Sequence, residues 1–211
     1  MTARILLADD QSMFRHGLRA VLEREGFEVV GEAEDGRETV RLAQKLRPAV
    51  AVLDISMPAL NGIDAARAIH KLDGEPIPII LLTMYEEDAY VLEALRAGIR
   101  GYVIKSQAAA DLVAAVRDVL RGAVYLSPGI CEVLVDACRT NGEPQAEPLT
   151  DREREVLQLI AEGNTTKAIA RTLSLSVRTA DSHRARIMQK LDLHTTADLV
   201  RYAIRRRIIQ P

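Results

Sequence analysis

Residues 49–58 read AVAVLDISMP, a short apolar run that ends in Asp54 and is followed by Met57 and Pro58. Small and β-branched apolar residues over about five positions are typical of a buried β-strand. A carboxylate that directly follows such a run lies where the strand ends. The run therefore predicts a strand that carries Asp54 to one edge of a sheet.

The first 122 residues repeat this pattern. Stretches with helical spacing, including residues 14–25, 37–46 and 109–121, separate five predicted strands at residues 4–8, 27–32, 49–53, 77–82 and 101–104. Five strands that alternate with five helices indicate a parallel α/β sheet, covered on both faces by right-handed crossovers. In such a sheet, ligands bind at the carboxyl ends of the strands.

Polar residues follow four of these strands. Asp9 and Asp10 follow the first, Asp54 the third, Thr83 the fourth and Lys105 the fifth. Three carboxylates at one edge repel one another unless a cation lies among them. Hard oxygen ligands of this kind favour Mg²⁺, which also binds phosphoryl oxygens. With a lysine and a hydroxyl opposite the metal, the set predicts a phosphoryl site in which Asp54 is the nucleophile.

The order of Asp9-Asp10, Asp54 with Met57-Pro58 and Gly62, Thr83, and Tyr102 before Lys105 resembles the receiver domain of two-component response regulators. The resemblance covers about residues 3–122. It implies a flavodoxin-like, doubly wound parallel sheet of five strands in the order 2-1-3-4-5. It also implies that a histidine kinase phosphorylates Asp54.

The resemblance assigns a role to each residue of the site. Asp10, Asp54 and the main-chain carbonyl of Ser56 are the implied Mg²⁺ ligands, and Asp9 acts mainly through a coordinated water. Thr83 and Lys105 are the implied contacts of the phosphoryl oxygens, and Tyr102 is the implied aromatic switch. The family often has a proline after the lysine, joined by a cis peptide bond, but Ser106 stands there in this chain.

Each residue taken alone also has an ordinary structural explanation. An Asp after a strand is often a helix cap, Thr83 and Tyr102 suit any strand, and Lys105 suits a solvated surface. The occurrence of all of them at successive strand ends favours the phosphoacceptor interpretation.

The rest of the chain divides at a change of composition. Residues 123–148 are predicted to form a connector with one short helix after Ser127-Pro128 and a linker from Arg139 to Pro148. Residues 149–211 carry 12 Lys and Arg against seven Asp and Glu, although the whole chain has a net charge of -2. The carboxy-terminal third is therefore basic, whereas the predicted receiver, residues 1–122, is acidic.

Helix signals in the basic third predict a helix-turn-helix. Thr150 and Glu153 form a capping box, and Gly163 ends the helix that follows. A second helix begins at Thr165 or Thr166, and a third follows Ser174-Leu175-Ser176. Its apolar residues share one face, as expected of a helix that packs on the others and leaves its polar face free.

That polar face is the predicted DNA interface, because a recognition helix of this kind enters the major groove. The predicted contacts are Lys167, Arg178, Thr179, Asp181, Ser182, Arg184, Ala185, Arg186, Gln189 and Lys190. Arg184, Arg186 and Lys190 flank the face and suit phosphate contacts, whereas Asp181 on the face suits a cytosine amino group. An ordinary solvated helix face is the alternative. His183 is interpreted as a helix-boundary histidine and not as a catalytic one.

The stretch from Leu149-Thr150 through Ala161-Glu162-Gly163 to Lys190-Leu191 is similar to the LuxR-type output domain. With the receiver, it resembles the NarL/FixJ family over nearly the whole chain. The resemblance implies a four-helix domain whose last helix, about residues 196–206, serves dimerisation through Leu199, Val200 and Ala203. It also implies a homodimer that binds double-stranded DNA when it is phosphorylated.

Two other classes of protein are weighed against this one. An aspartyl-phosphate hydrolase would have its nucleophile on the first strand and a second Asp two residues later, but Asp9 and Asp10 are adjacent. A protein-interaction module would bind a protein partner in place of DNA. The longest apolar run, residues 77–82, is far shorter than the roughly 20 residues of a membrane helix. The apolar stretch near the amino terminus is too short for a secretory signal, so a cytoplasmic protein is expected.

Overall fold

The computed structural model describes residues 2–84, 94, 97–130, 148–206 and 208–209. The chain forms two compact units, Met1–Glu143 and Pro144–Pro211. No helix within the described ranges is long and apolar enough to cross a membrane.

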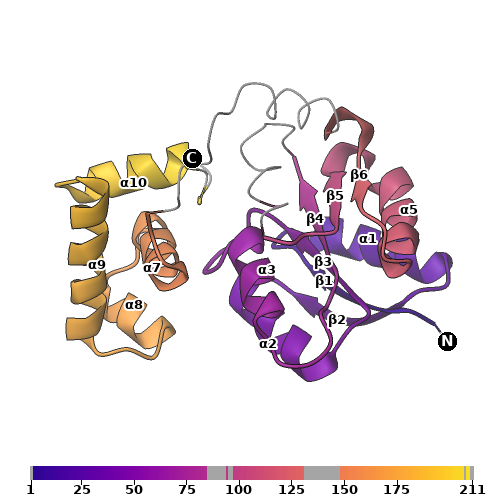
Figure 1. Ribbon diagram of the computed structural model, residues 1–211, viewed down its shortest axis with the longest axis horizontal. Coiled ribbons are helices and arrows are strands. Elements are labelled where there is room, and N and C mark those ends of the chain that lie inside the picture. The colour runs from indigo at the N-terminus through magenta and orange to yellow at the C-terminus, as the bar shows by residue number, and fades with distance from the viewer. Residues whose placement is uncertain (1, 85–93, 95–96, 131–147, 207, 210–211) are drawn as a thin grey trace. The chain divides into compact units, whose positions relative to one another are not determined.

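The first unit is built on a parallel sheet with the strand order β2-β1-β3-β4-β5-β6 (Figure 1). The six strands are β1 (Arg4–Ala8), β2 (Glu28–Ala33), β3 (Val50–Asp54), β4 (Ile79–Thr83), β5 (Gly101–Ile104) and β6 (Tyr125–Leu126). The first five strands along the chain lie in the predicted order 2-1-3-4-5.

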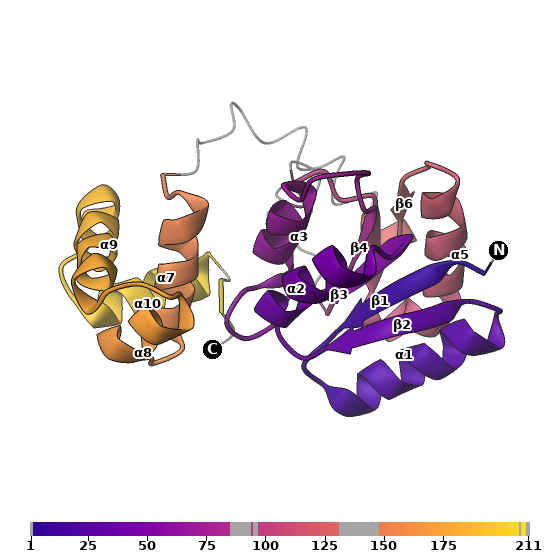
Figure 2. The ribbon, with the colours of Figure 1, turned by 90° about the horizontal axis from the view of Figure 1, so that it is seen from below.

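Helices cover both faces of the sheet. They are α1 (Ser12–Arg24), α2 (Gly36–Leu46), α3 (Gly62–His70) and α5 (Ala108–Leu120), and a short 3₁₀ helix, η1 (Lys105–Gln107), precedes α5. Alternate residues of β1 lie in two separate cores, Leu6 with those of α2 and α3 and Ile5 with those of α1 and α5. Figure 2 shows α1 and α2 on opposite sides of β1 and β2. The helix expected between β4 and β5 falls mostly outside the described residues.

The sixth strand corrects the prediction of a five-stranded sheet. Tyr125 pairs with Gly101 and Leu126 with Tyr102, so the start of the predicted connector belongs to the sheet. A strand of two half-buried residues is too short to show an alternating pattern in the sequence. The next residue, Ser127, is fully buried, and its hydroxyl donates to Asp111 on α5 at 2.7 Å. Helical structure begins at Pro128, but the remainder of the predicted connector helix lies outside the described residues.

In the described part of the second unit there are four helices, α7 (Asp151–Ala161), α8 (Thr166–Thr172), α9 (Val177–Leu191) and α10 (Thr196–Arg205). A Ser or Thr caps each amino terminus: Thr150, Thr165, Ser176 and Thr195. The predicted capping box of Thr150 and Glu153 is present, and a second one joins Thr195 to Asp198. Each cap satisfies a main-chain donor at a helix start, which fixes where the short helices begin.

Candidate functional site

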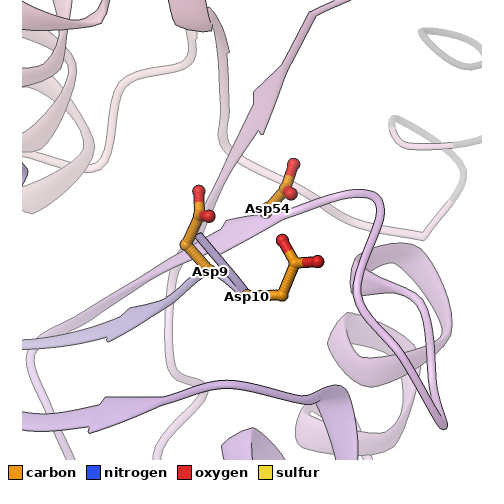
Figure 3. Close-up of side chains that lie close together, drawn as sticks. All are labelled: Asp9, Asp10 and Asp54. Atoms are coloured by element: carbon orange, nitrogen blue, oxygen red, sulfur yellow. The ribbon is translucent and has the colours of Figure 1, made fainter. Parts of the chain in front are cut away.

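Three carboxylates lie together at the carboxyl edge of the sheet. Asp9 and Asp10 follow β1 and Asp54 ends β3, and the register of these adjacent strands pairs Ala8 with Leu53. One oxygen of each carboxylate lies within 4.8 Å of the others. Figure 3 shows the three side chains gathered at this edge. Asp9 and Asp54 are 1% and 4% exposed, whereas Asp10 faces solvent.

Lys105 brings a positive charge into this cluster. Its Nζ atom lies 2.7 Å from Oδ2 of Asp9 and 2.9 Å from Oδ2 of Asp54. The ammonium also lies 4.8 Å from the centre of the Phe14 ring, within the range of a cation–π contact. Lys105 reaches this position because it is the first residue of η1, immediately after β5.

The surroundings set the ionisation of these groups. Burial raises the pKa of Asp54 above its ordinary value, although the Lys105 charge and the main-chain N–H of Ser56 act in the opposite direction. Burial alone would lower the pKa of Lys105, but Asp54 and Asp9 outweigh it and raise that pKa. The Lys105 ammonium therefore offsets part of the penalty that burial and crowding impose on the Asp54 charge.

Thr83 and Tyr102 lie on β4 and β5, of which β4 is next to β3 and β5 is next to β4. Thr83 ends β4, Tyr102 pairs with Leu81 across β4 and β5, and both side chains are 1% exposed. Burial raises the pKa of Tyr102 far above its ordinary value, and the Thr83 side chain acts in the opposite direction. The structure thus brings Thr83 to the end of the strand beside Asp54 and Lys105 to Asp54 from the end of β5, and it places Tyr102 inside the core.

The backbone around the site is closely packed at Gly62 and has no cis peptide bond at Lys105. A Cβ atom on Gly62 would lie 2.1 Å from the carbonyl oxygen of Asp54, so only glycine fits beside the acidic residue. The Gly62 N–H donates to Ile55 at 2.8 Å, which holds the loop after β3 in place. Among the described residues there is no cis peptide bond, so the bond between Lys105 and Ser106 is trans.

Sequence reasoning missed one residue beside the cluster, Arg15. It lies on the buried face of α1 with Leu18 and Leu22, and its Nη1 atom donates to the main-chain carbonyl of Asp9 at 2.5 Å. A charged residue at a position of the apolar stripe is the sequence signal that could have indicated it, because buried arginines need partners.

The predicted DNA interface lies mainly on the exposed face of α9. Its exposed members are Arg178, Thr179, Asp181, Ser182, Ala185, Arg186, Gln189 and Lys190, and Lys167 is exposed on α8. Ala180 and Ile187 are buried on the opposite face. The helix is therefore amphipathic in the predicted sense, with its polar side available to a ligand.

Two of the predicted phosphate contacts already have partners inside the protein. Arg184 is half-buried, and its Nη2 atom donates to the Thr196 hydroxyl at 2.6 Å. The Nζ atom of Lys190 donates to Glu153 at 2.7 Å. These contacts join α9 to α10 and to α7, so both residues support the position of the helix.

The predicted dimer contacts need a correction. Leu199 and Ala203 are completely buried within the second unit, where α10 packs against α7. Side chains without exposed surface cannot contact a second copy of the chain while this fold persists. Val200 is only half-buried, so it alone of the three presents surface.

Comparison with known proteins identifies both units. Residues 5–117 match the family model "Response regulator receiver domain", and residues 147–203 match "Bacterial regulatory proteins, luxR family". The transcriptional regulatory protein LiaR of Bacillus subtilis is 37% identical over 209 residues, which are 98% of this chain and 99% of LiaR.

Solved structures agree with these matches. A LuxR-family response regulator from Aurantimonas sp. SI85-9A1 is 38% identical, with a TM-score of 0.63 over 66% of this chain and 99% of that chain. The response regulator RcsB, solved in complex with DNA, is 30% identical, with a TM-score of 0.60 over 96% of this chain and 98% of RcsB. The chain therefore belongs to the two-component response regulators that join a receiver domain to a LuxR-type DNA-binding domain.

Proposed function

We propose that Asp54 is the phosphorylation site of this regulator and that its phosphorylation by a histidine kinase controls DNA binding. The main support for the proposal is that Asp9, Asp54 and Lys105 lie buried and in contact with one another at the sheet edge. An oxygen of Asp54 attacks the phosphorus atom of the donor. The new P–O bond replaces the P–N bond of the phosphohistidine, and the released imidazole nitrogen takes a proton from solvent.

The acidic cluster fits Mg²⁺ as its cofactor. Its donors are hard carboxylate oxygens close to one another, and the exposure of Asp10 leaves one side open for water ligands. Asp10, Asp54 and the carbonyl of Ser56 would hold the ion directly, and Asp9 through water. When bound, Mg²⁺ neutralises charge on the phosphoryl oxygens.

Lys105 and Thr83 are proposed to contact the phosphoryl group. Lys105 already pairs with Asp9 and Asp54, so a phosphoryl group on Asp54 would offer its ammonium a new anionic partner in place of Asp9. Thr83 ends the neighbouring strand and supplies a hydroxyl. In the absence of a kinase, the same residues support phosphorylation from small donors and slow loss of the phosphoryl group.

For the output side, we propose that α9 enters the major groove of double-stranded DNA and that the regulator binds as a homodimer. The basic charge of residues 149–211 and the exposed face of α9 support this proposal. The domain limits are proposed as 1–122 for the receiver, 123–148 for the connector and 149–211 for the output domain. Because its target is chromosomal DNA, we place the protein in the cytoplasm.

Labelling by a small phosphodonor tests the assignment of Asp54. The wild-type protein is expected to incorporate phosphate in Mg²⁺ and to lose that ability in EDTA, because the cation balances the charge of the cluster. Asp54→Asn should abolish labelling, whereas Asp73→Asn, which changes an exposed aspartate after the end of α3, should not. Intact-mass measurement of the three proteins provides the readout. Full labelling of Asp54→Asn, or labelling that EDTA leaves unchanged, would show that the site is elsewhere.

A further inference from the structure

Arg15 is a buried charge that the proposed chemistry does not use. It lies on α1, shares the buried face of that helix with Leu18 and Leu22, and is 6% exposed. Removal of a guanidinium from water costs several kcal/mol unless its donors are satisfied. Its partners therefore indicate what the residue does.

The three partners of Arg15 lie at the ends of two strands. Nη1 donates to the main-chain carbonyl of Asp9 at 2.5 Å, Nε donates to Glu32 at 2.9 Å and Nη2 donates to Glu34 at 2.8 Å. Asp9 directly follows β1, Glu32 lies in β2 and Glu34 directly follows β2. The planar guanidinium thus joins α1 to the two chain segments that leave the sheet beside the acidic cluster.

The contact with Asp9 fixes the main chain at the point where the carboxylates turn into the site. The Asp9 N–H donates to Ala33 at 3.1 Å, and the Asp9 side chain accepts from the N–H of Gln11 at 2.9 Å. With Arg15 on the carbonyl, the peptide groups on both sides of Asp9 are held. A rotation of this segment would move Asp9 and Asp10 together relative to Asp54.

We propose that Arg15 is a positioning residue that directs Asp9 and Asp10 toward Asp54 and so sets the affinity of the acidic cluster for a divalent cation. The inference rests on the proposed function of that cluster as a Mg²⁺ site. Arg15 acts through the main chain of Asp9 and does not contact the ion.

Charge and positioning make opposite predictions for this residue. If Arg15 acted only as a nearby positive charge, its removal would take one cation away from Glu32 and Glu34 and make the surroundings of the cluster more negative, which would strengthen the binding of a metal cation. If Arg15 positions the carboxylates, its removal disperses them and weakens binding. The sign of the change in affinity therefore separates the two roles.

The experiment titrates the full-length protein with Mn²⁺, a paramagnetic substitute for Mg²⁺, and measures the free ion by electron paramagnetic resonance. Arg15→Met should weaken Mn²⁺ binding by about tenfold or more, the usual effect of losing a group that orients metal ligands. Arg15→Lys keeps the charge but not the three-way contact, so it should also bind more weakly than the wild type.

Arg19→Met is the matched control. Arg19 lies one turn further along α1 and also pairs with Glu32, at 2.7 Å, but its side chain is 46% exposed and its contacts are to Glu32 and Glu23. Mn²⁺ affinity should stay at the wild-type value in this variant. Circular dichroism identifies a variant that does not fold. If Arg15→Met does not fold, the Mn²⁺ affinity of Arg15→Lys, which retains the buried charge, tests the positioning role.

The outcomes are distinct. Affinity in Arg15→Lys equal to that of the wild type, or tighter binding in a folded Arg15→Met, would overturn the positioning role. Asp54→Asn removes one of the proposed ligands and should bind Mn²⁺ more weakly than the wild type. A wild-type protein that binds no Mn²⁺, or binds it no more tightly than Asp54→Asn, would contradict the proposed metal site itself.

Discussion

Lys105 is the residue whose position is most informative about signalling. Its ammonium is shared by two buried carboxylates, and any anion added to Asp54 competes for it. The pKa of Lys105 is raised, so the group keeps its charge through the neutral range and can follow that anion. Its proposed task is to detect a phosphoryl group that has already arrived.

Lys105→Ala should therefore separate labelling from activation. We expect the variant to accept phosphate at Asp54 but to show no gain in DNA affinity on labelling, because no ammonium remains to move. Lys45→Ala, at an exposed position of α2, should behave as the wild type. Intact mass and DNA titration on the same samples provide both readouts. A normal gain of affinity in Lys105→Ala would refute this role.

Two exposed residues of α9 should differ in their effects on DNA binding. Arg186 is assigned to a phosphate, so Arg186→Ala should weaken specific and scrambled duplexes alike and reduce the salt slope by about 0.9. Asp181 is assigned to a base edge, so Asp181→Ala should alter the preference among sequences instead. Titration of each variant onto both duplexes at two salt concentrations measures this. Equal loss of specificity in the two variants would contradict the assignments.

At the scale of elements, Glu153 connects the start of α7 with the end of α9. Its carboxylate accepts from the Thr150 N–H at 2.8 Å and from Lys190 at 2.7 Å, and the residue is 4% exposed. Burial raises the pKa of Glu153, but Lys190 and Thr150 outweigh this and hold the pKa below its ordinary value. The ionised carboxylate therefore stabilises the fold of the second unit.

The sign of the pH dependence follows from that lowered pKa. The stabilisation is complete above the unfolded value of 4.5 and is lost as the pH falls through the lower pKa of the folded state. Glu153→Gln should lose about 1–2 kcal/mol at pH 7, as expected when a cap and a partly exposed ion pair are weakened. The loss should shrink toward pH 3. Urea unfolding at the two pH values measures it, and a loss that grows as the pH falls would contradict the account.

Element patterns predict some features of this chain and not others. The apolar runs at residues 4–8 and 101–104 predict the strands observed there, because each is long enough to show its preference. Strand β6 has two residues and shows none. The stripe on α10 predicts that Leu199 is buried, but amphipathicity does not say whether the apolar face meets its own domain or a second copy.

The candidate site shows the same division. The approach of Asp9, Asp10 and Asp54 is predictable because parallel strands end at one edge of the sheet. The contact of Arg15 with the Asp9 carbonyl is not, because it depends on the direction of a long side chain. The same holds for the contact between Lys190 and Glu153, which are 37 residues apart.

On the scale of the whole molecule, the acidic receiver and the basic output domain suggest how phosphorylation is transmitted. We propose that the receiver hinders DNA binding by the output domain until phosphorylation changes its surface and lets receivers pair. Two linked output domains then bind two half-sites with a higher effective concentration, without any new base contact. On this account, residues 149–211 alone should bind DNA without phosphate.

The most direct test of the account is the DNA affinity of the full-length protein before and after treatment with a phosphodonor in Mg²⁺. Wild-type protein should bind its duplex more tightly after treatment, Asp54→Asn should not respond, and residues 149–211 alone should bind equally in both conditions. Affinity should fall steeply with salt in every case, because DNA binding releases counterions. A full response in Asp54→Asn, or the absence of salt-dependent DNA binding by residues 149–211, would contradict the account.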